Sequence, residues 1–134
     1  MIERFAVGQQ AQVERTLTKH DVMVFADVTG DYNPVHVDAV AAAASPFGGQ
    51  IVHGMLTASL ISALLGTQLP GPGAIYVSQS LRFLRPVRLG DTVVARVEIT
   101  AIDTARRRVT LATTVHNQAG KAVLDGEATV ALPA

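Results

Sequence analysis

The sequence predicts an α+β fold in which a curved antiparallel sheet wraps around one long, buried helix. Residues 54–66 indicate the helix, because they are apolar almost all round and such a helix is normally buried in the middle of a domain. Four later segments have the near-alternating polarity and the Val, Thr, Ile and Leu content of strands, namely residues 74–84, 92–101, 107–116 and 122–132. The chain has 134 residues and no internal repeat or linker, so we expect a single domain, residues 1–134.

The first third of the chain supplies the remaining elements. Residues 11–17 alternate weakly in polarity, which predicts an edge strand. Thr18 and Asp21 have the spacing of a capping box, and the helix that they begin should end at Gly30, because glycine readily adopts the left-handed conformation. Residues 38–44 are rich in alanine and predict a further short helix.

Composition excludes several classes of function. The chain is 49% hydrophobic and 16% charged with a net charge of zero, so nucleic acid is not an expected partner. It has no cysteine, which excludes disulfides, thiol catalysis and cysteine–zinc sites. We find neither a signal-peptide pattern nor a membrane span, so we expect a cytoplasmic protein without a membrane partner. Because the chain is so apolar and carries so few charges, we expect it to bury part of its surface in an oligomer.

Residues 30–36, Gly-Asp-Tyr-Asn-Pro-Val-His, carry the strongest functional signal. They set Asp31, Asn33 and His36 around Pro34, which fixes its own φ and moves the preceding residue out of the α region. A carboxylate and an imidazole held on one rigid turn can activate water, because one group accepts a proton while the other orients the molecule. The alternative is structural: Asp31 or Asn33 caps a helix that begins near Pro34.

Further blocks of the chain combine with this heptapeptide into a recognisable signature. The blocks are Phe25-x-x-Val-Thr-Gly-Asp-x-Asn-Pro-x-His36 followed by Ala42, Ile51-Val-His-Gly-Met55, Leu69-Pro-Gly-x-Gly73 leading into Tyr76, and Phe83-x-x-Pro-Val-x-x-Gly-Asp91. Together they resemble the MaoC-like (R)-specific enoyl-CoA hydratases, above all the small single-domain enzymes that supply (3R)-hydroxyacyl-CoA for polyhydroxyalkanoate synthesis. The resemblance implies a hotdog fold, a homodimer, and no cofactor beyond the coenzyme A of the substrate.

This resemblance also implies a reaction, the addition of water to trans-2-enoyl-CoA to give (3R)-3-hydroxyacyl-CoA. Asp31 and His36 would hold and activate the water, and Asn33 would brace the loop. The N–H of Gly54, at the expected start of the buried helix, would stabilise the thioester oxyanion, since the first N–H groups of a helix lack partners. The alternative is that Gly54 only permits a tight turn into the helix.

Three other residues have a functional and a structural interpretation. The resemblance puts Ser62 near the active site, but a serine bonded back to its own helix would explain it equally well. Leu65 and Val130 are expected to line the pocket for the acyl chain. Leu65 follows Ile61 by four residues and Ser62 by three, so one helical face can carry all three toward the sheet. The alternative is that Leu65 and Val130 are ordinary core residues.

Histidine and arginine residues near these blocks leave further possibilities open. His53 is expected as a residue at the start of the helix and not as a ligand. Although a metal site can be imagined from His53, His36 and Asp31, nothing in the sequence requires one, and we expect no metal. Three arginines either meet the phosphates of coenzyme A or are simply solvated: Arg82, Arg85 and Arg88.

Other functions compete with hydration. Similar motifs serve (3R)-hydroxyacyl-ACP dehydratases, so the pattern identifies the reaction better than the carrier. Hotdog thioesterases often place a carboxylate on the central helix, but residues 55–65 contain none. A non-catalytic acyl-CoA-binding subunit would need neither Asp31 nor His36.

Overall fold

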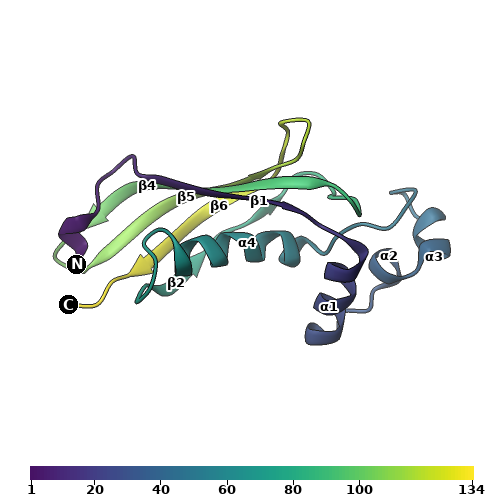
Figure 1. Ribbon diagram of the computed structural model, residues 1–134, viewed down its shortest axis with the longest axis horizontal. Helices are drawn as coiled ribbons and strands as arrows, with labels where there is room; N and C mark the ends of the chain where they lie inside the picture. Colours follow the sequence, from purple (N-terminus) through teal and green to yellow (C-terminus); the bar gives the residue numbers. More distant parts are fainter.

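The computed structural model describes residues 1–134 and consists of one antiparallel sheet, packed against a long helix, and a group of shorter helices (Figure 1). The strands are β1 (Gln10–Thr16), β2 (Ile75–Gln79), β3 (Arg82–Phe83), β4 (Thr92–Asp103), β5 (Arg108–His116) and β6 (Ala122–Ala131). The helices are the 3-10 turn η1 (Ile2–Arg4), α1 (Lys19–Thr29), α2 (Pro34–Val37), α3 (Ala39–Ala43) and α4 (Gly54–Thr67). The predicted α+β class, with a sheet around a long helix, is therefore confirmed.

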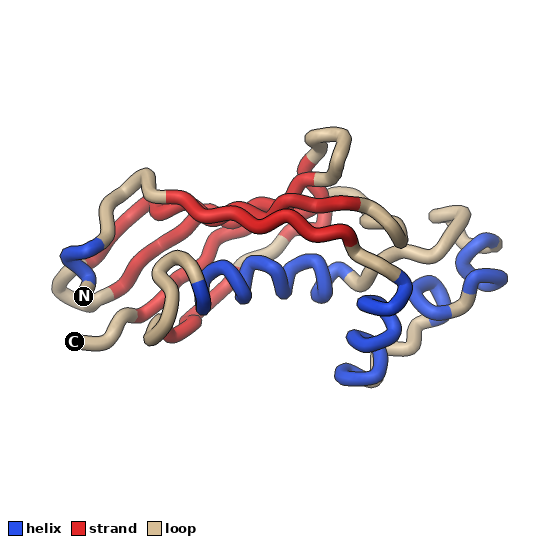
Figure 2. Tube along the Cα trace, in the orientation of Figure 1, coloured by secondary structure: helices blue, strands red, loops and turns tan.

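Strand order in the sheet is β1-β4-β5-β6-β2, and β3 pairs with β6 along the same edge as β2. The helix α4 runs along one face of this sheet, whereas α1, α2 and α3 lie together beyond the end of the sheet (Figure 2). The N-terminus of α4 points toward this helical group (Figure 1). The loops between α1 and α4 are thereby brought to the start of α4.

The hydrophobic core fills the space between α4 and the sheet. On β4 the residues Val93 and Val97 are fully buried while their neighbours are more exposed, as expected for a strand with one covered face. The helix contributes Ile61, Leu64 and Leu65. The composition of α4 predicts a helix that is buried on all sides, and this prediction is wrong for the single chain. The sheet covers only one side of the helix and leaves an outer face exposed.

Several local predictions are confirmed. Thr18 Oγ1 accepts a hydrogen bond from Asp21 N at 3.2 Å, and Asp21 accepts one from Thr18 N at 3.0 Å, which completes the capping box. The helix α1 ends at Gly30, whose φ of 79° is left-handed. The edge strand β1 and the strands β4, β5 and β6 lie within two residues of their predicted limits.

The prediction of one continuous strand over residues 74–84 is wrong, because this segment is divided into β2 and β3. The backbone passes so close to β6 at the break that a Cβ on Gly126 would lie 1.8 Å from the carbonyl oxygen of Ser80. After β3 the chain crosses the end of the sheet, where Arg88 forms a bridge with Ile51, and continues into β4 beside β1. None of the helices is both long and apolar enough to cross a lipid bilayer.

Candidate active site

The heptapeptide forms a turn followed by one turn of helix. Asn33 caps α2 by accepting a hydrogen bond from Val35 N at 3.3 Å, and Pro34 occupies the first turn. Asp31 stabilises the preceding turn, because one of its carboxylate oxygens accepts a hydrogen bond from Asn33 N at 3.2 Å. Asn33 therefore acts as a helix cap, as the structural alternative predicted. This cap is compatible with a functional placement of Asp31 and His36.

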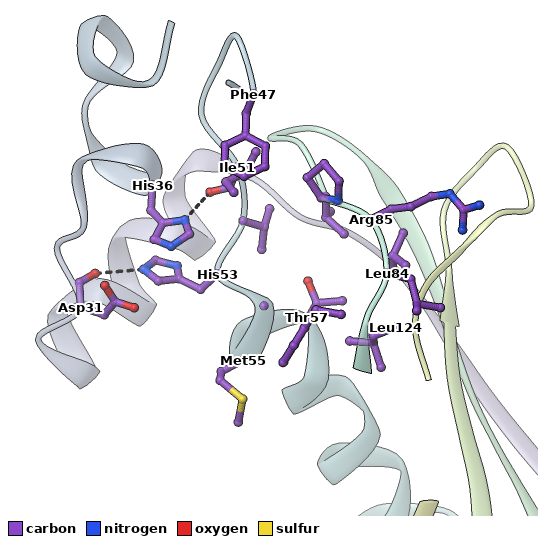
Figure 3. Close-up of a pocket in the computed structure, with 16 residues that line it drawn as sticks. Asp31, His36, Phe47, Ile51, His53, Met55, Thr57, Leu84, Arg85 and Leu124 are labelled. Atoms are coloured by element: carbon purple, nitrogen blue, oxygen red, sulfur yellow. Dashed lines mark hydrogen bonds between the residues drawn. The ribbon is translucent and has the colours of Figure 1, made fainter. Parts of the chain in front are cut away.

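Asp31 and His36 line one cavity of about 480 Å³ at the start of α4. Gly54 and Thr57 contribute to its wall from α4, and Phe83 and Arg85 contribute from β3 and the segment that follows it. Figure 3 shows Asp31, His36 and His53 grouped on one side of this cavity, with Leu84, Arg85 and Leu124 on the other. Residues that lie far apart in the sequence thus surround one space.

The side chain of His36 is held in a defined orientation. It is buried, and its Nδ1 lies 2.8 Å from the carbonyl oxygen of Ile51 (Figure 3). A carbonyl oxygen only accepts hydrogen bonds, so Nδ1 carries the proton, and Nε2 of the neutral ring is an acceptor. An imidazole fixed in this tautomer can remove a proton from a water molecule in the cavity.

His53 is the residue whose role sequence reasoning missed. It precedes α4, as predicted, but its side chain lies against His36 with the ring centroids 4.0 Å apart and the planes 27° from parallel. Its Nε2 lies 3.0 Å from the carbonyl oxygen of Asp31. Its Nδ1 and the hydroxyl of Thr57 are buried without a hydrogen-bond partner. The local signal that could have pointed to His53 is its place directly before Gly54.

Gly54 is the first residue of α4 and lines the cavity. Its N–H donates to no backbone carbonyl, and the preceding residue provides no side-chain cap. A Cβ at this position would lie 2.7 Å from Cε1 of Phe83, so a side chain would displace that ring. The glycine thus leaves an unpaired N–H, at the positive end of the helix dipole, beside the cavity.

Asp31, His36 and His53 are also the group whose potential metal-ligand atoms lie within 4.8 Å of one another. However, Nε2 of His53 is used in a hydrogen bond, and its Nδ1 is sealed from solvent. Nδ1 of His36 is likewise used in its hydrogen bond to the backbone carbonyl of Ile51. These contacts fit two histidines held by backbone carbonyls better than a metal site.

The two residues expected at the acyl pocket are Leu65, which lies farther along α4, and Val130, which lies on β6. Both line a hollow of about 160 Å³ together with Ser62 and Tyr76. A larger hollow of about 530 Å³ shares Ser62 and Tyr76 with it, and shares Met55 with the cavity that contains His36. Three hollows with common wall residues therefore follow one another along α4.

The placement of Ser62 differs from expectation in two respects. Ser62 does not line the cavity that contains Gly54, and it is exposed while Ile61 and Leu65 are buried against the sheet. The reason is the incomplete cover of α4, because Ser62 belongs to the outer face of the helix. The hydroxyl groups of α4 that bond back to the helix are those of Ser59 and Thr67.

The three arginines have different surroundings. Arg82 forms a two-pronged ion pair with Asp125, which raises the pKa of Arg82 and lowers the pKa of Asp125. Arg88 donates to the carbonyl of Phe47 at 2.7 Å. Arg85 donates to a backbone carbonyl at 2.6 Å, has no carboxylate partner, and is the one of the three that lines the cavity. Its guanidinium therefore forms no ion pair beside the candidate site.

One antiparallel sheet around a long helix, with a carboxylate and an imidazole beside the N-terminus of that helix, defines a hotdog protein with a candidate acid–base site. Residues 5–121 match the family model described as the MaoC like domain. The chain belongs to the MaoC-like family.

Individual relatives resemble the chain over nearly its whole length. It is 50% identical over 127 residues to an (R)-specific enoyl-CoA hydratase of Rhodospirillum rubrum, with 95% of this chain and 88% of the relative covered. It is 48% identical over 131 residues to a 3-hydroxybutyryl-CoA dehydratase of Methylorubrum extorquens, with 98% and 83% covered. The solved structure of an (R)-hydratase from A. caviae involved in PHA biosynthesis matches with a TM-score of 0.94 and 46% identity, over 96% of this chain and 98% of that one.

Proposed function

We propose that the protein is a hydro-lyase that adds water to trans-2-enoyl-CoA to give (3R)-3-hydroxyacyl-CoA. The observation that carries the proposal is one cavity that contains the Asp31 carboxylate, the His36 imidazole and the unpaired N–H of Gly54. The printed names of the relatives from Rhodospirillum rubrum and Methylorubrum extorquens support the same reaction and the same thioester carrier.

Each residue has a distinct part in this reaction. Water binds between Asp31 and Nε2 of His36, loses a proton to this pair, and its oxygen forms a bond to C3 of the enoyl group. The electron pair of the C2=C3 double bond moves toward the thioester, whose oxygen is stabilised by the N–H of Gly54. The proton taken from water is then delivered to C2. Water is thereby added across the double bond without any other reactant.

A coenzyme A carrier agrees with the charge at the cavity. Arg85 lines the cavity without a carboxylate partner, so it is available to a phosphate group of the substrate. A comparison of crotonyl-CoA with crotonyl acyl carrier protein tests the choice of carrier. We also propose that the enzyme works in the cytoplasm, where acyl-CoA thioesters are produced and consumed.

We further propose a homodimer in which two sheets meet edge to edge and coenzyme A crosses the subunit boundary. Support comes from the edge formed by β2 and β3, where several large apolar side chains are exposed: Ile75, Tyr76, Val77, Phe83 and Leu84. The exposed face of α4 adds Met55. A partner covering this edge would remove an apolar surface from water.

Hydration of crotonyl-CoA, followed by analysis of product chirality, tests the proposed reaction. The wild type should give (3R)-3-hydroxybutyryl-CoA. Asp31→Asn and His36→Gln nearly preserve shape but remove the carboxylate or the imidazole, so each should lower kcat by about two or more powers of ten. Matched controls are Asp27→Asn and His20→Gln, which change the same residue types on α1, outside the cavity. Near-normal hydration by a folded Asp31→Asn or His36→Gln variant would overturn the assignment of these residues.

A further inference from the structure

His53 contacts two other rings. The centroid of the Phe25 ring lies 4.8 Å away with the planes tilted by 50°, and the centroid of the His36 ring lies 4.0 Å away with the planes nearly parallel. Only 2% of His53 is exposed. The residue also forms the N-terminal boundary of α4, so its backbone is fixed by the helix. Its ring therefore has little freedom to turn or to move away from His36.

Hydrogen bonding defines the protonation of this ring. Nε2 lies 3.0 Å from the backbone carbonyl oxygen of Asp31, which can only accept, so Nε2 carries the proton (Figure 3). The neutral ring then has an unprotonated Nδ1, which is buried and has no partner. Leaving a buried acceptor unpaired costs stability, which calls for a functional explanation.

One side chain consequently contacts both members of the candidate catalytic pair. The hydrogen bond fixes the backbone of Asp31, and the ring contact fixes His36. When His36 takes a proton from water, a positive charge develops next to a neutral ring whose unpaired nitrogen carries negative partial charge. A preorganised dipole in a buried site stabilises such a charge more strongly than water does.

We propose that His53 is a positioning residue for the hydration reaction, which fixes Asp31 through Nε2–H and supports the positive charge that His36 acquires. The inference rests on the proposed function, because it gives His36 the role of base. The titratable or charged groups that line this cavity are Asp31, His36, His53 and Arg85. Asp31 and Arg85 are present in every variant described next, so they do not account for differences between variants.

Two substitutions separate the contacts of His53. His53→Phe keeps an aromatic ring against Phe25 and His36 but removes both nitrogens. His53→Gln retains an amide N–H that can reach the carbonyl of Asp31 but removes the ring. With crotonyl-CoA, His53→Phe should lower kcat roughly 10- to 100-fold with little change in KM, as is typical when a residue that orients a catalytic group is lost.

Rescue by the second variant distinguishes this role from a purely structural one. His53→Gln should recover part of kcat relative to His53→Phe, because it restores the bond to Asp31. A folded His53→Phe variant with wild-type kcat would overturn the inference.

A measurement on the wild type covers the case in which His53→Phe does not fold. Long-range ¹H–¹⁵N correlations of the imidazole rings report which nitrogen carries the proton. They should show Nε2–H for His53 and Nδ1–H for His36, and the opposite tautomer of His53 would overturn the inference. If the wild type fails to hydrate crotonyl-CoA, the proposed function itself fails. If the wild type is active and His53→Phe equals it, only the role of His53 fails.

Discussion

Leu65 shows how one side chain can belong both to the core and to a pocket. It is a member of the hydrophobic core and also lines the hollow of about 160 Å³, together with Val130 and Tyr76. This hollow shares wall residues with the larger one beside it, which in turn shares Met55 with the cavity that contains His36. An acyl chain that runs along α4 from a thioester at Gly54 would reach Leu65 after passing Ser62.

We expect the wild type to prefer short chains, and Leu65→Ala should therefore improve the use of longer enoyl-CoA substrates. The substitution removes three carbons beside the hollow, at a cost of about 2–5 kcal/mol in the free energy of unfolding, because the side chain is buried. The measurement is kcat/KM for substrates with about four to ten acyl carbons, corrected for the folded fraction.

Leu64→Ala provides the matched control. Leu64 is the neighbouring residue on α4 and is buried to a similar degree, at 1% exposure against 2% for Leu65, but it lines none of the three hollows. It should lose comparable stability without any change in the chain-length profile. If stably folded Leu65→Ala also kept the profile of the wild type, Leu65 would be a core residue alone.

Single residues also differ in how far the sequence predicts them. Asp31 and His36 could be predicted because both lie in one short motif around Pro34. The same motif gave no information on Phe83, which covers Gly54 from a strand far along the chain. The stack of His53 on His36 likewise depends on how the segment between them folds back. Contacts between distant segments require the tertiary structure, which a local pattern does not contain.

Among the elements, α1 has the clearest electrostatic signature. The backbone N–H of Thr18, and then the side chain of Arg15, donate hydrogen bonds to Asp21, which lowers the pKa of Asp21 below its usual value of 3.8. A carboxyl group whose pKa is lower in the folded state stabilises the fold above the pKa of the unfolded chain. This contribution is lost as the pH falls through the lower, folded-state pKa.

Asp21→Asn should reduce the free energy of unfolding near neutral pH by roughly 0.3–1.5 kcal/mol, because it keeps the shape of the cap but removes its charge. As the pH falls through the folded-state pKa of Asp21, which lies below 3.8, the difference from the wild type should shrink, since the wild-type carboxyl group becomes protonated as well. Urea unfolding at pH 7 and at pH 3 measures both effects. Glu14→Gln, an exposed change on β1 without a hydrogen bond in the chain, should show neither effect, and equal losses in the two variants would contradict the role of the cap.

Elements that depend on a repeating pattern or a local cap could be predicted well. Strands β4, β5 and β6 follow alternating polarity, and α1 follows from its two caps. The break between β2 and β3 could not be predicted, because it arises where the backbone of Ser80 meets Gly126 on another strand. The pairing of β2 with β6 instead of β4 also lies outside any local signal.

The whole molecule has two free sheet edges with different chemistry. The edge strand β1 exposes polar side chains such as Gln12 and Glu14, which discourage pairing. The opposite edge exposes Val77 to 50% and Phe83 to 54%. This asymmetry favours association through β2 and β3 and leaves β1 in contact with water.

Sedimentation at micromolar concentration should accordingly give twice the chain mass of 14.1 kDa. Val77→Lys introduces a charge at the apolar edge and should shift the protein toward the monomer, because burial of an unpaired charge is unfavourable. Gln12→Lys, on the opposite edge, should remain dimeric. A well-folded and fully active wild-type monomer would refute the proposed assembly.

The close contact between Phe83 and Gly54 has a consequence for how the protein responds to dilution. The Phe83 ring fills the space that a side chain at position 54 would take, and Phe83 itself belongs to the apolar edge. In the proposed dimer, any shift of that edge when subunits separate would thus be passed directly to Gly54, whose N–H is proposed to stabilise the thioester oxygen. Turnover per chain would then depend on the equilibrium between monomer and dimer, and the specific activity would fall as the enzyme is diluted.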